Sequence, residues 1–271
     1  MERRQESPAA KKSLGQNFLV DRNIAAKIVA ALEIGSRDKV LEIGPGRGAL
    51  STLIRDSGPD VFVALEKDPH WARELKKAMP SVQVLNVDGL AFAWERLGAG
   101  EEDVRPWKVI GNLPYNVASP LIWDILGQAP GLARLVCMVQ KEVGLRLAAK
   151  PGNKVYGALS VWVQSFSRVE LLFSVSPQVF RPRPKVDSAV LRFTPVEKKQ
   201  KIFSGRALSF LVKRCFQQRR KQLRTILKDY GADVVLSFLA EHDLSATARP
   251  EELSPEQFQI LSNLLESRFP A

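Results

Sequence analysis

The feature that most limits what this chain can fold into is an alternation of short apolar runs with amphipathic stretches through its first half. The apolar runs cover residues 40–43, 61–65, 82–87, 109–110 and 135–139, and each is typical of a buried strand. The intervening stretches 49–56, 69–78 and 118–126 have apolar residues at helical spacing. Strands that alternate with helices are typical of a parallel sheet, so the sequence predicts an α/β fold.

The second half of the chain changes this pattern twice. Residues 158–166 are predicted to be helical, and two strand-like runs, 169–175 and 189–193, follow with little but the proline-rich segment 177–184 between them. This arrangement favours an antiparallel addition at one edge of the sheet. A polar, lysine-rich stretch, 197–201, is typical of a linker, and only helical periodicity follows it. We expect an N-terminal segment (1–38), an α/β domain (39–195) and a small all-α domain (205–271).

The first predicted strand ends in a glycine-rich turn at residues 44–48, which leads into a helix. Glycines at a strand end let the backbone approach a ligand closely, and the N-terminus of the next helix favours negative or polar groups. Gly44, Gly46 and Ala49 also fit the dinucleotide fingerprint, so the turn alone does not identify the cofactor. Glu66, after the second strand, is placed to bind ribose hydroxyls in either case.

Two further strand ends separate these alternatives. Asp88 ends the third predicted strand, where it can accept a hydrogen bond from an adenine amine, and Asn112-Leu113-Pro114-Tyr115 ends the fourth. Because ligands of open α/β sheets bind at the carboxyl ends of the strands, these residues converge on one site. A nicotinamide enzyme has no evident use for this tetrapeptide, and the chain lacks a recognisable hydride-site histidine or lysine. The site favours an amino methyltransferase with S-adenosylmethionine as its cofactor.

The segment 112–115 suits chemistry on an adenine amine, which is a poor nucleophile because its lone pair is delocalised into the ring. The side-chain oxygen of Asn112 and a backbone carbonyl can accept both amine hydrogens and leave the lone pair directed at the methyl group. Pro114 stiffens the loop that holds these acceptors. Tyr115 offers a ring on which the base can stack, worth about 1–3 kcal/mol. We expect Asn112, Leu113, Pro114 and Tyr115 to act by orientation, without a general base.

The positive charge of the chain is concentrated in one stretch. Residues 181–228 contain 15 basic and two acidic residues, a net charge of +13, whereas the whole chain has +11 and the remainder therefore −2. An excess of this size favours a polyanionic partner, because each neutralised phosphate releases counterions. The expected phosphate contacts are Arg183, Lys185, Lys213, Arg219, Arg220, Lys221 and Arg224.

The spacing of residues 213, 220, 224 and 228 predicts that several of these basic side chains share one helical face. Residues 219–221 are adjacent, so they cannot all face one phosphate track. We expect one or two of them to pack against the α/β domain instead. The remaining cations would position RNA without reading its sequence, and site choice would come from RNA shape and an extruded base.

Other classes of protein are disfavoured. No apolar run reaches the roughly 20 residues that a membrane helix needs. The first 12 residues are polar and lack the apolar core of a signal peptide. The two cysteines and two histidines have no metal-ligand spacing, so no metal is expected. We therefore expect a cytoplasmic protein.

The chain resembles a known family in an ordered series of motifs that runs almost from end to end. The matching segments are Leu14-Gly15-Gln16-Asn17-Phe18-Leu19, Leu41-Glu42-Ile43-Gly44-Pro45-Gly46-Arg47-Gly48, Gly111-Asn112-Leu113-Pro114-Tyr115, Gln140-Lys141-Glu142-Val143, Tyr156-Gly157-Ala158-Leu159-Ser160-Val161, Pro182-Arg183-Pro184-Lys185-Val186-Asp187-Ser188-Ala189-Val190 and Arg219-Arg220-Lys221-Gln222-Leu223. Any one motif is moderately specific, whereas the ordered set is highly specific. The chain is similar to the small-subunit ribosomal RNA adenine dimethyltransferases of the KsgA/RsmA family.

This resemblance implies a Rossmann-like class I methyltransferase sheet with a small C-terminal all-α domain. It implies that residues before the first strand join the S-adenosylmethionine site, whose contacts would be Asn17, Leu19, Gly44, Gly46, Glu66, Asp88 and Asn112. It implies that Phe180 stacks the flipped adenine opposite Tyr115. The implied substrate is two adjacent adenosines in a hairpin loop near the 3′ end of small-subunit (16S) RNA. Each would be methylated twice, within a pre-assembled small ribosomal subunit, by an enzyme that we expect to be monomeric.

Two alternatives stay open at this point. A methyltransferase that acts on a large-subunit RNA adenine, of the antibiotic-resistance type, would share the sheet, although residues 184–188 and 219–221 favour the small-subunit type. A ribosome-assembly or transcription factor could keep the fold and act mainly by binding. The intact turn at 44–48 and the intact segment 112–115 argue against loss of chemistry, although not against an additional role in subunit assembly.

Overall fold

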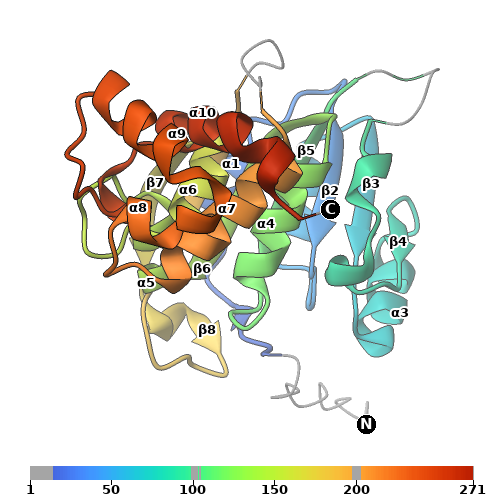
Figure 1. Ribbon diagram of the computed structural model, residues 1–271. Helices are drawn as coiled ribbons and strands as arrows, with labels where there is room; N and C mark the ends of the chain where they lie inside the picture. The colour runs from blue at the N-terminus through green and yellow to red at the C-terminus, as the bar shows by residue number, and fades with distance from the viewer. Residues whose placement is uncertain (1–14, 99–102, 104, 197–202, 271) are drawn as a thin grey trace, which may run out of the picture.

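The computed structural model describes residues 15–98, 103, 105–196 and 203–270 (Figure 1). Its main sheet has the strand order β4-β3-β2-β5-β6-β9-β7. These strands are β2 (Lys39–Ile43), β3 (Val61–Leu65), β4 (Gln83–Leu85), β5 (Trp107–Asn112), β6 (Leu132–Gln140), β7 (Ser167–Val175) and β9 (Ser188–Pro195). The strands from β4 to β6 are parallel, whereas β9 pairs antiparallel with both β6 and β7. The predicted α/β sheet and its antiparallel edge are confirmed.

Helices cover both faces of this sheet. The helices α1 (Arg22–Ala30), α2 (Ser51–Asp56) and α3 (Pro69–Ala78) contribute to one core cluster, which contains Val40, Ile110 and Val136 from the strands. The helices α4 (Ala118–Gln128), α5 (Lys141–Leu147) and α6 (Ala158–Phe166) contribute to the cluster on the other face, with Leu41 and Val109. Successive strand residues point to opposite faces, which explains how nearly continuous apolar strands supply both cores.

The C-terminal helices pack onto α6 rather than standing apart. They are α7 (Gly205–Gln217), α8 (Leu223–Ile226), α9 (Lys228–Glu241) and α10 (Pro255–Leu265), drawn from orange to red in Figure 1. Leu211 of α7 and Phe258 of α10 are fully buried and belong to the same apolar cluster as Val163 of α6. The helices that we expected to form a small domain therefore continue the core of the α/β part.

Several boundaries match the prediction and others move for identifiable reasons. The elements β3, α3 and α6 occupy the predicted ranges. The third strand was predicted at 82–87 but ends at Leu85. The side-chain amide of the next residue, Asn86, donates hydrogen bonds to the carbonyls of Glu66 (2.8 Å) and Lys67 (3.2 Å). The helix predicted at 49–56 begins at Ser51, because the turn that contains Gly48, with its φ of +78°, extends through Leu50.

Short elements that periodicity did not reveal connect the N-terminal segment to the rest of the chain. The strand β1 (Phe18–Leu19) pairs antiparallel with β8 (Phe180–Arg181), so residues far apart in sequence lie side by side. The helices α1 and α5 were also not predicted. Asp21 caps α1 by accepting a hydrogen bond from the N–H of Ile24 at 3.0 Å.

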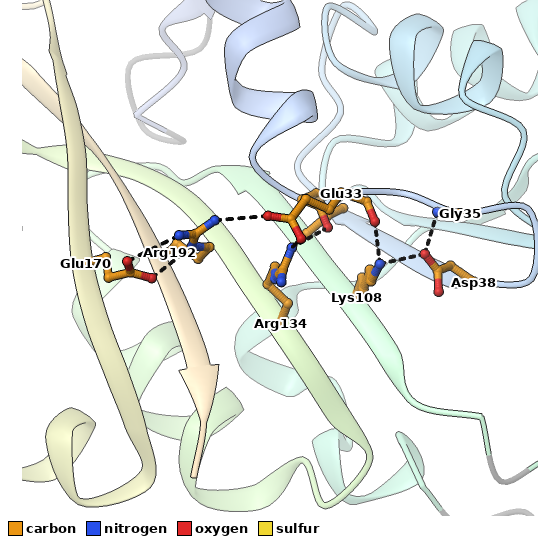
Figure 2. A network of polar contacts seen from close by, with 8 residues as sticks. Glu33, Gly35, Asp38, Lys108, Arg134, Glu170 and Arg192 are labelled. Atoms are coloured by element: carbon orange, nitrogen blue, oxygen red, sulfur yellow. Dashed lines mark hydrogen bonds and ion pairs between the residues drawn. The ribbon is translucent and has the colours of Figure 1, made fainter.

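Below α1, a network of ion pairs and hydrogen bonds crosses the sheet from β5 to β7, and Lys108 of β5 joins it through a hydrogen bond to the backbone carbonyl of Glu33 (Figure 2). Glu33 pairs with Arg134 of β6 at 2.6 Å and with Arg192 of β9 at 3.1 Å. Arg192 continues to Glu170 of β7 at 2.9 Å, and Lys108 of β5 pairs with Asp38 at 2.6 Å. These contacts tie the loop that follows α1 to the parallel and antiparallel parts of the sheet.

Two classes of feature are missing from the part of the chain that the structure covers. No helix there is long and apolar enough to cross a membrane. Nor do three or more His, Cys, Asp or Glu residues gather there in a way that would hold a metal ion. The expected linker at 197–201 lies outside the described residues.

Candidate active site

A cavity opens at the carboxyl ends of β2, β3 and β5, where parallel strands place their following loops at one edge of the sheet. It is lined by residues from four separate strand ends and from the N-terminal segment. The predicted residues that line it are Asn17, Leu19, Gly44, Gly46, Glu66, Asp88, Asn112, Leu113, Pro114 and Tyr115. The structure thus brings together all the expected cofactor contacts and the expected catalytic segment 112–115.

The glycine turn after β2 requires backbone geometry that other residues rarely adopt. Gly44 has a φ of +66° and Gly46 a φ of +52°, both in the left-handed region. A Cβ atom on Gly46 would lie 2.9 Å from Cε1 of Phe18, closer than side chains approach one another. The turn can therefore pass beneath Phe18 only because residue 46 has no side chain.

Glu66 organises this turn from the end of β3. Its side chain is 6% exposed, and its two carboxylate oxygens accept hydrogen bonds from the N–H groups of Gly46 (2.9 Å) and Asp68 (2.8 Å). Burial raises the pKa of Glu66, and these backbone N–H groups oppose the rise. Because a carboxylate has about four acceptor positions, Glu66 can hold the turn and still accept hydrogen bonds from a ribose diol.

Asp88 lies three residues beyond the end of β4, at the rim of the cavity. It caps a short 3-10 helix by accepting a hydrogen bond from Leu90 N–H at 3.1 Å, and it pairs with Lys67 Nζ at 2.7 Å. Burial opposes ionisation, but the hydrogen bonds from Lys67 and Leu90 outweigh it and hold the pKa of Asp88 below its usual value. Asp88 is thus an ionised acceptor, and Lys67 is a partner that sequence reasoning missed.

Asn112 ends β5 and is oriented by the N-terminal segment. Its side-chain nitrogen donates a hydrogen bond to the backbone carbonyl of Asn17 at 3.0 Å. With the nitrogen held in this way, Oδ1 is the end of the amide that can accept a hydrogen bond from a ligand amine. This contact joins residues 95 positions apart, so no local pattern could have revealed it.

The rest of the segment 112–115 is fixed by neighbouring strands. Leu113 is buried and donates its N–H to the carbonyl of Met138 on β6 at 3.1 Å. Tyr115 is half-buried and lines the cavity, and its hydroxyl oxygen lies 2.7 Å from Oγ of Ser188 on β9. The segment is therefore anchored to β6 through Leu113 and to β9 through Tyr115.

The N-terminal segment lies across the turn and contributes more than the resemblance implied. The Phe18 ring contacts the Trp71 ring edge-on at 5.3 Å, and the guanidinium of Arg47 lies 4.7 Å from the centre of the Phe18 ring. A Cβ atom on Gly15 would lie 2.9 Å from Oδ1 of Asn116, which shows how closely the segment approaches the loop after β5. A contact of this kind depends on tertiary packing and has no signature in sequence periodicity.

Among the residues predicted to bind the cofactor or the target base, Phe180 is the one that does not line the cavity. Its side chain is 0% exposed and packs in the core cluster on the α1 face of the sheet. Its backbone pairs with Leu19, which itself lines the cavity. In this conformation the ring has no surface for a base, so a stacking role would require it to move out of the core.

The predicted phosphate contacts separate into three groups. Arg183 and Lys185 are exposed on the loop between β8 and β9. Lys213 and Arg219 line a groove beside α4, together with the aromatic side chains Trp123, Tyr156 and Phe216. Arg220, Lys221 and Arg224 are exposed and face solvent near the start of α8. Both the cavity and the groove reach the N-terminal end of α4, where Val117 lines the cavity and Ser119 lines the groove.

The prediction that several of residues 213, 220, 224 and 228 share one helical face is wrong, because 213, 224 and 228 lie on three different helices. The helix α7 ends at Gln217, and residues 218–222 form a turn before α8. Arg219 explains the break, because its guanidinium pairs with Glu251 and donates to the carbonyls of Lys154 (2.6 Å) and Asn153 (3.1 Å). The expectation that one of the three adjacent cations packs against the α/β part is confirmed for Arg219.

Solved structures of two enzymes share this architecture over nearly their whole length. A dimethyladenosine transferase from Plasmodium falciparum is 25% identical, with a TM-score of 0.77 over 92% of this chain and 96% of that one. The 23S rRNA methyltransferase ErmE is also 25% identical, with a TM-score of 0.69 over 92% of this chain and all of that one. Fold and site together define a class I S-adenosylmethionine-dependent methyltransferase.

Sequence comparison identifies the family within this class. The family model "Ribosomal RNA adenine dimethylase" matches residues 8–267. A ribosomal RNA small subunit methyltransferase A from Oleidesulfovibrio alaskensis is 56% identical over 98% of this chain and 95% of its own length. A protein of the same name from Chlorobium luteolum is 42% identical over 95% and 90%. The chain belongs to the ribosomal RNA adenine dimethylase family, and S-adenosylmethionine is its cofactor.

Proposed function

We propose that this enzyme dimethylates the exocyclic amines of two adjacent adenosines in a hairpin loop near the 3′ end of small-subunit (16S) ribosomal RNA. The observation that carries the proposal is the orientation of Asn112, whose amide nitrogen is held by Asn17 so that its oxygen can accept from an amine. The small-subunit specificity rests on relatives that bear that name at 42–56% identity.

The residues at the cavity fit S-adenosylmethionine. Gly44 and Gly46 leave room at the strand end for the cofactor to approach the backbone. Glu66 is placed to accept from the ribose hydroxyls, and the ionised Asp88 from the adenine amine. Asn17 and Leu19 would close the site from the N-terminal side. When bound, the cofactor supplies an electrophilic methyl group on a sulfonium.

The chain's own contribution to methyl transfer is orientation. Asn112 Oδ1 and a backbone carbonyl of the segment 112–115 would accept the amine hydrogens, which directs the nitrogen lone pair away from them. Tyr115 would stack on the base and hold its plane. Alignment of two reactants in this way can contribute up to about 7–11 kcal/mol to lowering the barrier. No general base is required to activate the amine, since the sulfonium supplies the driving force, and the methylated nitrogen then releases its extra proton to solvent.

We propose that the substrate RNA runs from the cavity along the groove beside α4. The ammonium of Lys213 lies 5.1 Å from the centre of the Trp123 ring in this groove, an arrangement that suits a phosphate beside a stacked base. Arg183 and Lys185 would contact RNA on the β9 side, and Arg220, Lys221 and Arg224 would add phosphate contacts. Arg219 would support the groove through its existing bonds, since its guanidinium already has protein partners.

The partner in the cell would be a pre-assembled small ribosomal subunit, met in the cytoplasm by a monomeric enzyme. A large-subunit substrate is the alternative, because ErmE has the same fold. The relatives at 42–56% identity do not favour it, since each carries the small-subunit name. A binding-only assembly factor is also not favoured by an intact cofactor cavity, although a role in subunit biogenesis is compatible with catalysis.

Methyl transfer to three substrates tests this proposal. Purified enzyme and labelled S-adenosylmethionine are incubated with unmethylated small subunits, naked small-subunit RNA and large-subunit RNA. We expect dimethyladenosine on the small subunit, identified by nuclease digestion and mass spectrometry. Product on large-subunit RNA, or no product with any substrate, would overturn the proposal.

The role of Asn112 is tested by Asn112→Ala. We expect turnover to fall at least about a hundredfold, because misplaced reactants lose the benefit of alignment. Binding to the small subunit should change little, since the predicted phosphate contacts lie outside the cavity. Turnover close to that of the unmodified enzyme would contradict the proposed contact with the amine.

A further inference from the structure

The hydrogen bond between Tyr115 and Ser188 is a feature of the site that the proposed chemistry does not require. The two hydroxyl oxygens lie 2.7 Å apart, within the range of a strong neutral hydrogen bond. Burial raises the pKa of Tyr115, and the bond to Ser188 opposes this rise, so the phenol is neutral at physiological pH. The bond joins the loop after β5 to a strand that begins 73 residues later in the chain.

Ser188 is a rigid anchor. Its side chain is fully buried at the first position of β9. At this position β9 pairs on one side with Gln140 of β6 and on the other with Val175 of β7. A residue held by antiparallel partners on both sides has little freedom to shift, because its backbone is fixed by two sets of ladder hydrogen bonds.

Tyr115, by contrast, lies beyond the last paired residue of its strand. The pairing of β5 with β6 ends at Asn112, and α4 does not begin until Ala118. The ring is only half-buried because one side faces the cavity. Without the hydroxyl contact, the ring would be restrained at Cβ and by its packing alone, and its plane could tilt toward the cavity.

The anchor also lies next to the segment that carries Arg183 and Lys185. Ser188 directly follows Asp187, whose carbonyl accepts a hydrogen bond from Lys141 N–H at 2.9 Å. The Asp187 carboxylate also lies 3.5 Å from Lys141 Nζ. The same short segment therefore connects the basic loop that precedes β9 to the ring at the cavity.

We propose that Ser188 is a positioning residue, whose hydroxyl fixes the plane of the Tyr115 ring so that the stacked adenine presents its amine in the direction set by Asn112. This inference rests on the proposed stacking of the base on Tyr115. A stacked base takes its plane from the ring beneath it, so a tilt of the ring moves the exocyclic amine relative to the methyl group. Small errors of alignment lower the rate of transfer much more than they lower binding.

Loss of the hydrogen bond between Tyr115 and Ser188 should lower the yield of dimethyladenosine more than it lowers the rate of the first methyl transfer. Dimethylation uses the same ring geometry twice, once for each methyl group. The second transfer competes with departure of the monomethylated base from the cavity, so a slower transfer lets more of that base leave. A loss of positioning therefore increases the share of monomethyladenosine, whereas a smaller amount of folded protein leaves that share unchanged when products are compared at an equal extent of reaction.

The test compares Ser188→Ala, Tyr115→Phe and the double variant, each of which removes the same hydrogen bond. We expect each single variant to lower kcat for small subunits about five- to tenfold, the effect of losing one hydrogen bond. KM for S-adenosylmethionine should change little, and the monomethyl share should rise. The double variant should be no slower than the slower single variant, because the bond can be removed only once.

Two further variants and a second readout separate positioning from stability. Ser188→Thr retains a hydroxyl and should recover most of kcat, whereas Ser174→Ala, an exposed serine on β7, should leave kcat unchanged. RNA carrying 2-aminopurine at the target position reports stacking by its emission. At saturating protein this emission should differ between the unmodified enzyme and Tyr115→Phe, without any turnover.

The outcomes distinguish this inference from the proposed function. Unchanged kcat in Ser188→Ala, or multiplicative losses in the double variant, would overturn the positioning role while methylation by the unmodified enzyme stands. If Ser188→Ala does not fold, Tyr115→Phe removes the same bond from the other side, and its kcat decides the question. Failure of the unmodified enzyme to methylate small subunits would instead contradict the proposed function.

Discussion

At the scale of single residues, the shape of the cofactor cavity depends on the lack of a side chain at Gly46. Gly46 combines a left-handed φ of +52° with a Phe18 ring 2.9 Å from where its Cβ would be. Sequence alone showed that a glycine-rich turn was present, and two cofactor classes fitted it. Only the structure shows that Phe18 makes residue 46 intolerant of any side chain.

Gly46→Ala should therefore weaken S-adenosylmethionine binding. The added methyl group forces Phe18 or the turn to shift, and the left-handed backbone adds a strain of about 1 kcal/mol or more. We expect Kd, measured by isothermal titration calorimetry, to rise about tenfold or more. Gly58→Ala is a matched control for backbone strain, since Gly58 has a φ of +68° but open space around its Cβ. Equal affinity in the two variants would contradict the role of the Phe18 contact.

Glu42 is a second residue whose importance only the structure reveals. It is 1% exposed at the cavity and accepts a hydrogen bond from Ser51 Oγ at 2.6 Å. Burial raises its pKa from about 4.5 to about 8, although the Ser51 bond opposes this rise. Between these two values the folded protein holds a proton that the unfolded chain releases, so the free energy of unfolding falls as pH rises.

Glu42→Gln should remove this pH dependence. The contribution of Glu42 changes by at most about 1.4 kcal/mol per pH unit, so the variant should gain stability relative to the unmodified protein between pH 5.5 and pH 8.5. Urea unfolding at the two pH values measures the difference. Ser51→Ala keeps the carboxyl group and should retain the dependence. An identical difference between Glu42→Gln and the unmodified protein at both pH values would be inconsistent with a buried proton.

At the scale of elements, long periodic segments were predictable and short ones were not. The limits of β3, α3 and α6 follow from their own apolar patterns. By contrast, β1 and β8 contain two residues each and exist because they pair with one another. The break after α7 also has a tertiary cause, since Arg219 turns to reach carbonyl groups of the 153–154 loop. Elements that form only because of contacts with distant residues have no local sequence pattern from which they could be predicted.

The network of ion pairs and hydrogen bonds in Figure 2 connects elements in the same way and can be tested through Glu33. Glu33→Gln removes ion pairs to Arg134 and Arg192, so β6 and β9 lose their common partner. Since Glu33 is 58% exposed, we expect a loss of about 0.5–1 kcal/mol in the free energy of unfolding at low salt, and less at high salt.

The measurement is urea unfolding of Glu33→Gln at low and high ionic strength. Glu142→Gln serves as a control, because Glu142 makes a single exposed pair with Arg146 on α5. That control should lose less than Glu33→Gln does. A loss for Glu33→Gln that is independent of salt would point to packing rather than charge as its cause.

At the scale of the whole molecule, the expected α/β domain and the expected all-α domain share one apolar core. Leu211 of α7 is fully buried in a cluster that also contains residues of α4, α6 and the sheet. An apolar core that is continuous across two regions favours unfolding as one cooperative unit. We therefore propose that the C-terminal helices are an extension of the catalytic core with a basic outer surface.

Leu211→Ala should destabilise the whole chain by about 2–5 kcal/mol, the usual effect of a cavity in a packed core. Tryptophan fluorescence has contributions from five tryptophans, two of which, Trp123 and Trp162, lie beside α7. This fluorescence and far-ultraviolet circular dichroism should show one coincident transition. Leu236→Ala on α9 is the control, since Leu236 is 41% exposed and should cost little. Two separate transitions would show instead that the helical part unfolds independently.

The sequence by itself determined the α/β sheet, the strand ends that carry Gly44, Glu66 and Asn112, and the basic character of the C-terminal half. These features are local, because strand and helix periods, turn residues and charge are properties of adjacent positions. Tertiary structure alone decided that Asn17 orients Asn112, that Phe180 lies in the core and that Ser188 reaches Tyr115. Each depends on contacts between distant segments, which form only when the sheet order and the register of β9 are set.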